Sequence, residues 1–451
     1  MRPSVNPMVG SVFPILIFFL TMIFSGFLEK LPFLNGLHIL TILGGIALVV
    51  IFLSGRYVPV VKHPIASPLL IFTVWLIVGI PFSVWPGGSY AIWSNMWSKS
   101  VLSFVMVAGC IQTIKEVKTV YKTMGYSIGV LSVMALLLNG RDVTGRLGLL
   151  DTRYENANDF GWTLILGLSF LLYLFKRGTG WEKLTSLALS APIMLALVRT
   201  GSRGSMVGLA VLALVEFLDA KRTTKIQLAI AVPVLAILLL FITPQDLRSR
   251  YTTIFGAGEN TALTGEYLSR SERLQNTAAG SAEARWTMIK DSIYLTMHHP
   301  VMGVGPGVFQ VAQVDLAMAR GETRGAWRVT HNTFTQISSE MGLPGLAIYL
   351  WFLYECFKSL NWIIRSRVPG KSWDELRAQA TALRVTFFMV TAVAMFGSYA
   401  YDTNIPILGG MACALSLMAK QRYALQSRQA AAAQTPTALA ELEAEPVAAA
   451  V

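Results

Sequence analysis

The chain of 451 residues is 54% hydrophobic and only 14% charged, with 37 lysines and arginines against 25 aspartates and glutamates. Soluble domains carry about 25% charged residues, so the composition excludes an ordinary water-soluble globular protein, and it is too apolar for general disorder. The net charge of +12 is best explained by membrane topology and anionic lipids, because most basic residues lie between apolar runs. We therefore expect membrane lipids, and no nucleic acid, among the partners.

Apolar runs near the ~20 residues that a bilayer requires recur along the chain, and each predicts a membrane span. A β-barrel would show alternating segments of about ten residues instead. The sequence therefore predicts an all-α polytopic membrane protein with about 12 transmembrane helices, the first of which we expect to be a span and not a cleaved signal peptide. The expected spans are residues 8–28, 36–54, 64–84, 98–114, 118–138, 157–175, 184–199, 203–219, 225–243, 333–357, 380–399 and 403–420.

The distribution of lysine and arginine predicts the orientation of these spans. An even number of spans puts both termini on one side, and the loops on that side hold most of the basic residues. By the positive-inside rule, both termini lie in the cytoplasm. The basic groups that decide this are Arg56 and Lys62; Lys115, Lys118 and Lys122; Lys176, Arg177 and Lys183; Lys221, Arg222 and Lys225; and Lys358, Arg365, Arg367, Lys371, Arg377 and Arg384.

One long loop, between the ninth and tenth spans, faces outward by the same alternation. Long loops in compact structures are usually functional. Apolar residues at helical spacing predict a helix over 281–298, and the glycine- and proline-rich run 300–307 predicts a turn-rich loop. The expected domains are 1–243 with spans one to nine, 244–332 as a helical outward loop domain, 333–420 with spans ten to twelve, and 421–451 as a low-complexity cytoplasmic tail.

The outward loops offer arginines where many enzymes that act on diphosphates offer clustered carboxylates for a divalent cation. Arg199 and Arg203 are four residues apart, where they can share one helical face, and the glycines between and after them allow close backbone approach. Guanidinium groups bind phosphate oxygens in bidentate fashion. The alternative is an interfacial pair solvated by lipid headgroups. Arg285 lies next to Trp286. Considered alone, an arginine beside a tryptophan is more typical of a stacked surface residue than of a ligand-binding residue.

His331 stands where the long loop enters the tenth span. Its imidazole is suited to accept a proton near neutral pH, although a histidine at a helix start is more often a cap or a packing residue. Glu340 follows inside the same span, where a carboxylate is costly, and we expect a basic group across the bundle to pair with it. The segment Gly342–Gly345, with a proline inside, should kink or loosen that helix.

Several of these segments occur in a characteristic order: Thr200–Gly204 (TGSRG), Ala284–Trp286 (ARW), Pro300–Phe309 (PVMGVGPGVF), His331–Phe334 (HNTF) and Ser339–Gly345 (SEMGLPG). In that order they resemble the bacterial O-antigen ligase/polymerase family of lipopolysaccharide biosynthesis. The rest of the chain is similar to the family only in its pattern of spans.

The resemblance implies a GT-C-like membrane glycosyltransferase fold with no cofactor and no metal, acting on polyprenyl-diphosphate-linked glycans at the periplasmic face of the inner membrane. The large loop between spans nine and ten favours an O-antigen ligase, which would move O-antigen polysaccharide from undecaprenyl diphosphate to the lipid A–core oligosaccharide. An O-antigen polymerase or a protein O-oligosaccharyltransferase of the same family is the nearer alternative. A transporter of lipid-linked saccharides is the alternative outside enzymes.

The expected mechanism assigns roles to four residues. Arg203 and Arg285, with Arg199 as a neighbour, would bind the diphosphate and stabilise the charge that grows on it. His331 would be the general base for an acceptor hydroxyl, and a single displacement would invert the anomeric carbon. In a transporter the arginines would bind without chemistry and His331 would be structural, but a transporter does not need the long loop that carries His331 and Arg285.

Overall fold

The computed structural model describes residues 6–31, 38–141, 145–242, 270–321 and 328–443. Within these ranges the fold is all-α, and the only β-type pairing is an isolated bridge between Arg141 and Leu147. The helices before the long loop are α1 (Pro7–Gly10), α2 (Phe13–Ser25), α3 (Phe27–Lys30), α5 (Ile39–Leu53), α6 (Tyr57–Val61), α7 (Ala66–Gly79), η1 (Ile80–Phe82), α8 (Pro86–Ile92), η2 (Trp93–Trp97), α9 (Ser98–Cys110), α10 (Ile114–Leu138), α11 (Ala157–Arg177), α12 (Gly180–Thr200), α13 (Arg203–Asp219) and α14 (Arg222–Ile242). Those that follow are α16 (Arg270–His298), α17 (Phe309–Ala319), α18 (Thr333–Arg365), α19 (Lys371–Val393), η3 (Ala394–Phe396) and α20 (Asn404–Glu443).

Each of the apolar segments predicted from the sequence coincides with a helix, which confirms an all-α membrane protein. Among the described residues, five helices are long and apolar enough to cross a membrane, and two apolar helices are shorter. The count of twelve spans and the GT-C-like arrangement therefore stay predictions. The five are Pro7–Ser25, Ile114–Leu138, Ala157–Arg177, Gly180–Thr200 and Lys371–Phe396; the shorter two are Ile39–Leu53 and Ala66–Phe82.

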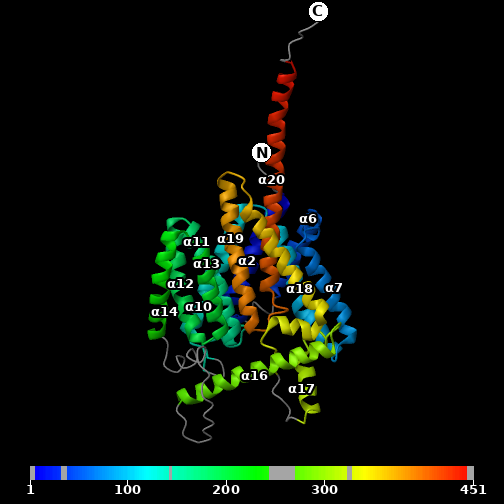
Figure 1. Ribbon diagram of the computed structural model, residues 1–451, viewed down its shortest axis with the longest axis vertical. Coiled ribbons are helices and arrows are strands. Elements are labelled where there is room, and N and C mark those ends of the chain that lie inside the picture. Colours follow the sequence, from blue (N-terminus) through cyan, green and yellow to red (C-terminus); the bar gives the residue numbers. More distant parts are fainter. Residues whose placement is uncertain (1–5, 32–37, 142–144, 243–269, 322–327, 444–451) are drawn as a thin grey trace, which may run out of the picture.

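The helices form a bundle with two different ends (Figure 1). Both termini lie at one end, the terminus end. Helices α16 and α17, from the long loop, lie at the other, the site end, where α16 runs across the bundle and packs against α18. The helix predicted over 281–298 is confirmed, although it begins earlier, at Arg270. The predicted loop domain also includes 243–269 and 322–327, which lie outside the described residues.

The tenth predicted span is interrupted. Helix α18 has non-helical backbone angles at Gly342 (φ 70°, ψ −178°), which confirms the predicted kink. Backbone groups freed by a break inside a bundle need other partners. The Met341 carbonyl accepts a hydrogen bond from the Trp75 indole (2.9 Å), and the Leu343 N–H donates to the Pro300 carbonyl (2.8 Å). The glycine-rich loop 300–308 therefore packs into the break.

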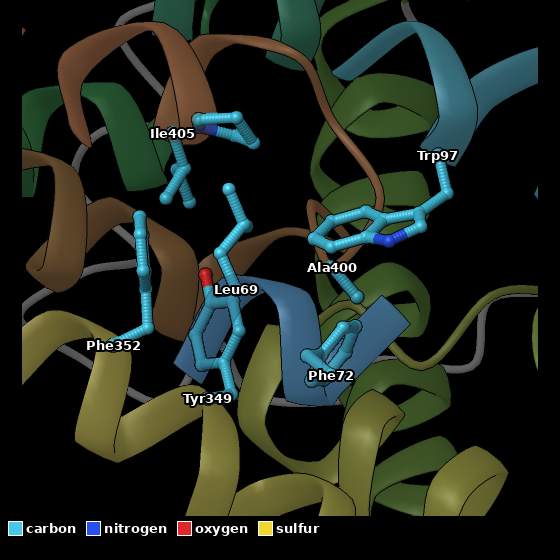
Figure 2. A pocket seen from close by; sticks show the side chains of 8 residues that line it. Leu69, Phe72, Trp97, Tyr349, Phe352, Ala400 and Ile405 are labelled. Atoms are coloured by element: carbon cyan, nitrogen blue, oxygen red, sulfur yellow. The ribbon is translucent and has the colours of Figure 1, made fainter. Parts of the chain in front are cut away.

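The bundle core beneath this break is close-packed. Figure 2 shows a small apolar cavity there, between side chains of α7, α18, α20 and the neighbouring segments. Its volume is about 10 Å³, which is roughly the smallest space that can hold one water molecule. Trp97 is fixed at its edge by a hydrogen bond from its indole N–H to the Thr73 hydroxyl (2.9 Å). The core in this region is therefore tightly packed.

The last helix is the longest. α20 begins at Asn404, at the site end, passes through the bundle and continues beyond it to Glu443 (Figure 1). The segment predicted as a low-complexity tail, 421–451, is thus helical as far as Glu443, and 444–451 lie outside the described residues.

Candidate functional site

Two turns meet at the site end, one leading into α18 and the other into α20. The His331 N–H donates to the Ser398 hydroxyl (3.0 Å). The Thr333 hydroxyl donates to the Gly397 carbonyl (2.8 Å) and accepts from the Tyr399 N–H (3.0 Å). These bonds join backbone to side chain in both directions, so each turn fixes the conformation of the other.

His331 occupies the centre of the first turn. Its backbone is left-handed (φ 54°), a conformation uncommon for a residue other than glycine. The helix cap is its neighbour Asn332, whose side-chain oxygen accepts from the N–H groups of Phe334 and Thr335. The sequence left a capping role open for His331, and the structure gives that role to Asn332.

The surroundings of His331 keep its imidazole neutral. Burial and then the positive charges of Arg285 and Arg328 lower the pKa of His331 from 6.5 to about 4. A neutral imidazole at pH 7 can accept a proton.

Arg285 lies on α16 and is brought to the His331 turn by the crossing of that helix over α18. Its charge acts on His331 and also on Tyr399, in the second turn. The sequence had suggested that Arg285 alone is typical of a residue stacked on Trp286. The cation above the Trp286 ring is instead Lys290, at 5.5 Å from the ring centre. Arg285 is therefore half-buried at the site and not part of that exposed stack.

Arg199 and Arg203 do not share one helical face, so that prediction is wrong. α12 ends at Thr200, Gly201 is left-handed (φ 58°), and Ser202 caps α13, which begins at Arg203. The two arginines are thus in the last turn of one helix and the first position of the next. The physical reason is the glycine, which lets the chain reverse where a continuous helix would have aligned them.

Arg203 starts its helix beside the second turn. A Cβ on the next residue, Gly204, would lie 2.7 Å from the Phe396 Cβ, so α13 begins in close contact with the segment that leads to Ser398. Arg199 is tied elsewhere: its carbonyl accepts from the Leu147 N–H (3.1 Å). The structure brings Arg285 and His331 together and packs the start of α13 against the segment before Ser398, whereas the Arg199 backbone contacts Leu147.

Glu340 is 1% exposed, and the prediction of a basic partner across the bundle is wrong. Its carboxyl group accepts from the Gly307 N–H (3.0 Å), the Phe309 N–H (3.4 Å) and the Tyr401 hydroxyl (2.7 Å). Consecutive turn amides can surround an anion without any cation. Glu340 therefore holds the glycine-rich loop and the second turn together.

A cavity of about 550 Å³ opens beside the two turns. Val329 and Ser398, on either side of the His331 backbone, line it, whereas His331 and the three candidate arginines are not among its lining residues. Its polar wall is formed by Lys99, Arg153, Asp159, Asp402, Asn404, Asn95, Gln310 and Gln336.

Asp159 and Asp402 were not predicted from the sequence as part of the site. They are far apart in the chain, and α11 and α20 bring them into one cavity. Burial raises the pKa of Asp402, while the Asn404 N–H (2.6 Å) and the charge of Arg153 oppose that rise. Their common signal in the sequence was the position of each near the outward start of a predicted span. In the part of the chain that the structure describes, no three His, Cys, Asp or Glu side chains form a group that could hold a metal ion.

Arg146 is a further residue that the sequence did not single out. Its buried guanidinium donates to the Thr200 carbonyl (2.6 Å) and to the Asn158 side chain (2.8 Å). It thereby fixes the end of α12, next to the α13 start, against the beginning of α11.

Comparison with known proteins identifies the central part of the chain. Residues 185–350 match the family described as O-antigen ligase, and this segment holds Arg199, Arg203, Arg285, His331 and Glu340. A search of curated proteins finds no match. The family consists of glycosyltransferase-like enzymes that act on lipid-linked polysaccharides at membranes. With its apolar helical bundle, the chain thus carries an O-antigen ligase family domain over residues 185–350, which supports its membership of the O-antigen ligase/polymerase family.

Proposed function

We propose that the protein is an O-antigen ligase: an inverting, metal-independent glycosyltransferase that moves O-antigen from undecaprenyl diphosphate to the lipid A–core oligosaccharide. The observation that carries the proposal is the His331 turn. Its imidazole is kept neutral by burial and by the charges of Arg285 and Arg328, and its backbone is fixed by the turn that borders the cavity.

In the proposed reaction, His331 acts as the general base and accepts the proton of an acceptor-sugar hydroxyl. The hydroxyl oxygen forms a bond to the anomeric carbon of the donor from the face opposite the diphosphate. The bond from that carbon to the diphosphate oxygen breaks, and undecaprenyl diphosphate leaves with the bonding electrons. One displacement inverts the configuration and needs no enzyme nucleophile.

Arg203 and Arg285 would bind the diphosphate and stabilise the charge that it gains, with Arg199 as an outer contributor. The start of α13 packs against Phe396, close to Ser398, and Arg285 on α16 acts on His331; both observations support this assignment. Preorganised guanidinium groups can do here what a divalent cation does in other transferases.

The proposed orientation is a multi-pass protein of the inner membrane, with both termini in the cytoplasm and the site in the periplasm. The lysine- and arginine-rich connections join helices at the terminus end, opposite α16 and α17 (Figure 1). We keep the division into spans one to nine (1–243), a periplasmic domain (244–332), spans ten to twelve (333–420) and a cytoplasmic tail (421–451).

Reconstitution in liposomes with lipid-linked O-antigen and purified lipid A–core tests the proposal. Glycan on the lipid A–core is the expected product. A longer carrier-bound chain would instead identify a polymerase, glycan on a protein acceptor would identify an O-oligosaccharyltransferase, and movement of the lipid-linked glycan across the bilayer without product would identify a transporter.

Chelation tests metal independence in the same assay. We expect transfer to survive EDTA, measured with a detergent-solubilised acceptor because chelation disturbs lipopolysaccharide itself. Loss of transfer that Mg²⁺ or Mn²⁺ restores would contradict the role given to the arginines.

A further inference from the structure

The cavity beside the two turns has a wall that the proposed chemistry does not use. Its polar side chains come from η2, α9, the connection before α11, α11 itself, α17, α18 and the turn into α20, so segments far apart in the sequence build it. Its volume of about 550 Å³ falls within the ~300–1,000 Å³ of small-ligand sites.

Trp162 and Tyr399 form an aromatic part of this wall. The Trp162 side chain is 2% exposed, its indole N–H has no hydrogen-bond partner among the described residues, and its ring stacks on Tyr399 (4.6 Å between centres, 13° between planes). An indole N–H can only donate, and a buried one usually has a partner. The stacked Trp162 and Tyr399 rings, which both line the cavity, give it an aromatic wall.

Acceptors and further donors lie around the same space. Asp402 accepts from the Asn404 N–H, which leaves carboxylate capacity for another donor. The Gln336 side-chain oxygen is engaged by the Ala400 N–H (3.3 Å), and its amide N–H₂ donors belong to the same wall. A ligand that matches this wall must both donate and accept at several points, as a sugar ring with its hydroxyl groups does.

The charges in the cavity argue against a phosphate as its occupant. The two carboxyl groups, Asp159 and Asp402, stand opposite two cations. One of these, Arg153, is already engaged, since it pairs with Glu29 (3.4 Å) and donates to the Ile23 carbonyl (2.8 Å). An anion would meet two acidic groups and one exposed cation, Lys99, whereas a neutral polyhydroxyl ligand avoids the repulsion.

We propose that this cavity is a saccharide subsite, in which Trp162, Asp402 and Gln336 bind one sugar ring of a substrate next to His331. The proposal rests on the proposed function and deepens it. Ser398, which lines the cavity and accepts a hydrogen bond from the His331 backbone N–H, connects the cavity wall to the turn that carries the proposed base. The ring belongs either to the acceptor oligosaccharide or to the first sugars of the donor, and both have the same chemistry.

Binding measurements on the purified full chain test the subsite without any turnover. Three probes are titrated by calorimetry: deacylated core oligosaccharide, a short polyprenyl diphosphate carrying the glycan, and the same polyprenyl diphosphate without sugar. The variants are Trp162→Phe, which removes the indole donor, and Asp402→Asn, which removes a carboxylate acceptor. Matched controls at the terminus end are Trp181→Phe, at a side chain 72% exposed, and Asp374→Asn.

We expect each cavity variant to weaken one of the two glycan probes about tenfold, with the bare polyprenyl diphosphate and both controls unchanged. Weakening of the core probe assigns the subsite to the acceptor, and weakening of the glycosylated diphosphate assigns it to the donor. Unchanged binding of both glycan probes, or equal weakening of the bare diphosphate, overturns the subsite. Absence of transfer product with the wild-type protein would overturn the proposed ligase function. The binding measurements would still decide, independently of turnover, whether the cavity binds a saccharide.

Discussion

The terminus end and the His331 turn use charge in different ways. At the terminus end, charged side chains pair with opposite charges on neighbouring helices, as Lys118 does with Glu182 (2.7 Å) and Arg384 with Asp219 (2.8 Å). At the His331 turn, the charges that act on the imidazole, Arg285 and Arg328, have the same sign as its protonated form. The first arrangement satisfies charge within the protein, and the second holds a group in the neutral state that it needs for chemistry.

The difference extends to the backbone. The terminus end begins α10 and α12 with capping boxes, Thr113 with Glu116 and Thr179 with Glu182. The site end instead fixes left-handed residues, His331 and three glycines of the loop 300–307, through hydrogen bonds and contacts from other segments. Strained backbone persists where the surroundings determine it, and such places are often functional.

The largest expected effect is loss of transfer when His331 is replaced. General-base catalysis is typically worth ~10²–10⁴-fold, so we expect His331→Asn to lose at least about a hundredfold in transfer rate. Asparagine tolerates the left-handed conformation, so this variant removes the base and keeps the turn; His331→Ala tests the same loss with a residue less suited to it. Donor binding and membrane insertion should be retained.

His298→Ala, at an exposed helical histidine of the same end, is the control for the loss of an imidazole as such. Near-normal transfer by His331→Asn would remove His331 from the mechanism.

A smaller but still large loss is expected for the arginines. Arg203→Ala and Arg285→Ala should each reduce transfer by about ten- to a hundredfold and weaken binding of the diphosphate donor, and lysine should restore little because it lacks the planar fork. Full activity with lysine at both positions would show that a general positive field is sufficient.

Arg285 also gives the comparison a pH test. With the His331 pKa near 4, wild-type transfer should fall only as the pH approaches that value, because protonation removes the base. Arg285→Gln removes a charge that lowers this pKa, so the residual activity of the variant should fall at a higher pH, nearer 6.5. If the acidic limb of the profile of kcat/KM against pH is unchanged, the charge of Arg285 does not lower the pKa of His331.

These outcomes concern residues that the sequence could identify only in part. Apolar runs predicted the helices, and the Gly342–Gly345 segment predicted the break in α18, because both are local signals. The reversal at Gly201, the amides around Glu340 and the meeting of Asp159 with Asp402 were not predicted. Each depends on which distant segments the bundle brings together, and periodicity carries no information on that.

Two glycines with nearly equal φ, Gly342 and Gly55, differ in how closely other segments pack against them. At Gly342 (φ 70°, ψ −178°) a Cβ would lie 2.0 Å from the Val301 carbonyl oxygen, whereas at Gly55 (φ 71°), at the terminus end, nothing lies within 4 Å. We expect Gly55→Ala to cost about 1 kcal/mol in stability and Gly342→Ala to cost about 3 kcal/mol or more, with lost transfer. Thermal unfolding in detergent measures both, and equal losses would mean that the loop does not depend on the break.

The smallest effect is expected at the terminus end. Lys118→Ala removes a partly exposed ion pair with Glu182, and Lys122 remains near the same carboxylate (3.7 Å). The stability loss should be below ~1 kcal/mol and transfer should be unchanged. A transfer defect in this variant would contradict the separation of the two ends.

The length of helix α20 can be compared with the thickness of the membrane that we propose it crosses. Its 40 residues rise ~1.5 Å each and span about 60 Å, while the hydrocarbon layer is ~30 Å thick. In the proposed orientation, this helix starts at the cavity wall, crosses the lipid and extends beyond it on the far side. Spin labels placed one at a time from Asn404 to Ser427 would report how accessible each position is to water. The first label that is again in water marks the far membrane surface, and the number of residues from Asn404 to that label gives the distance from the cavity to that surface.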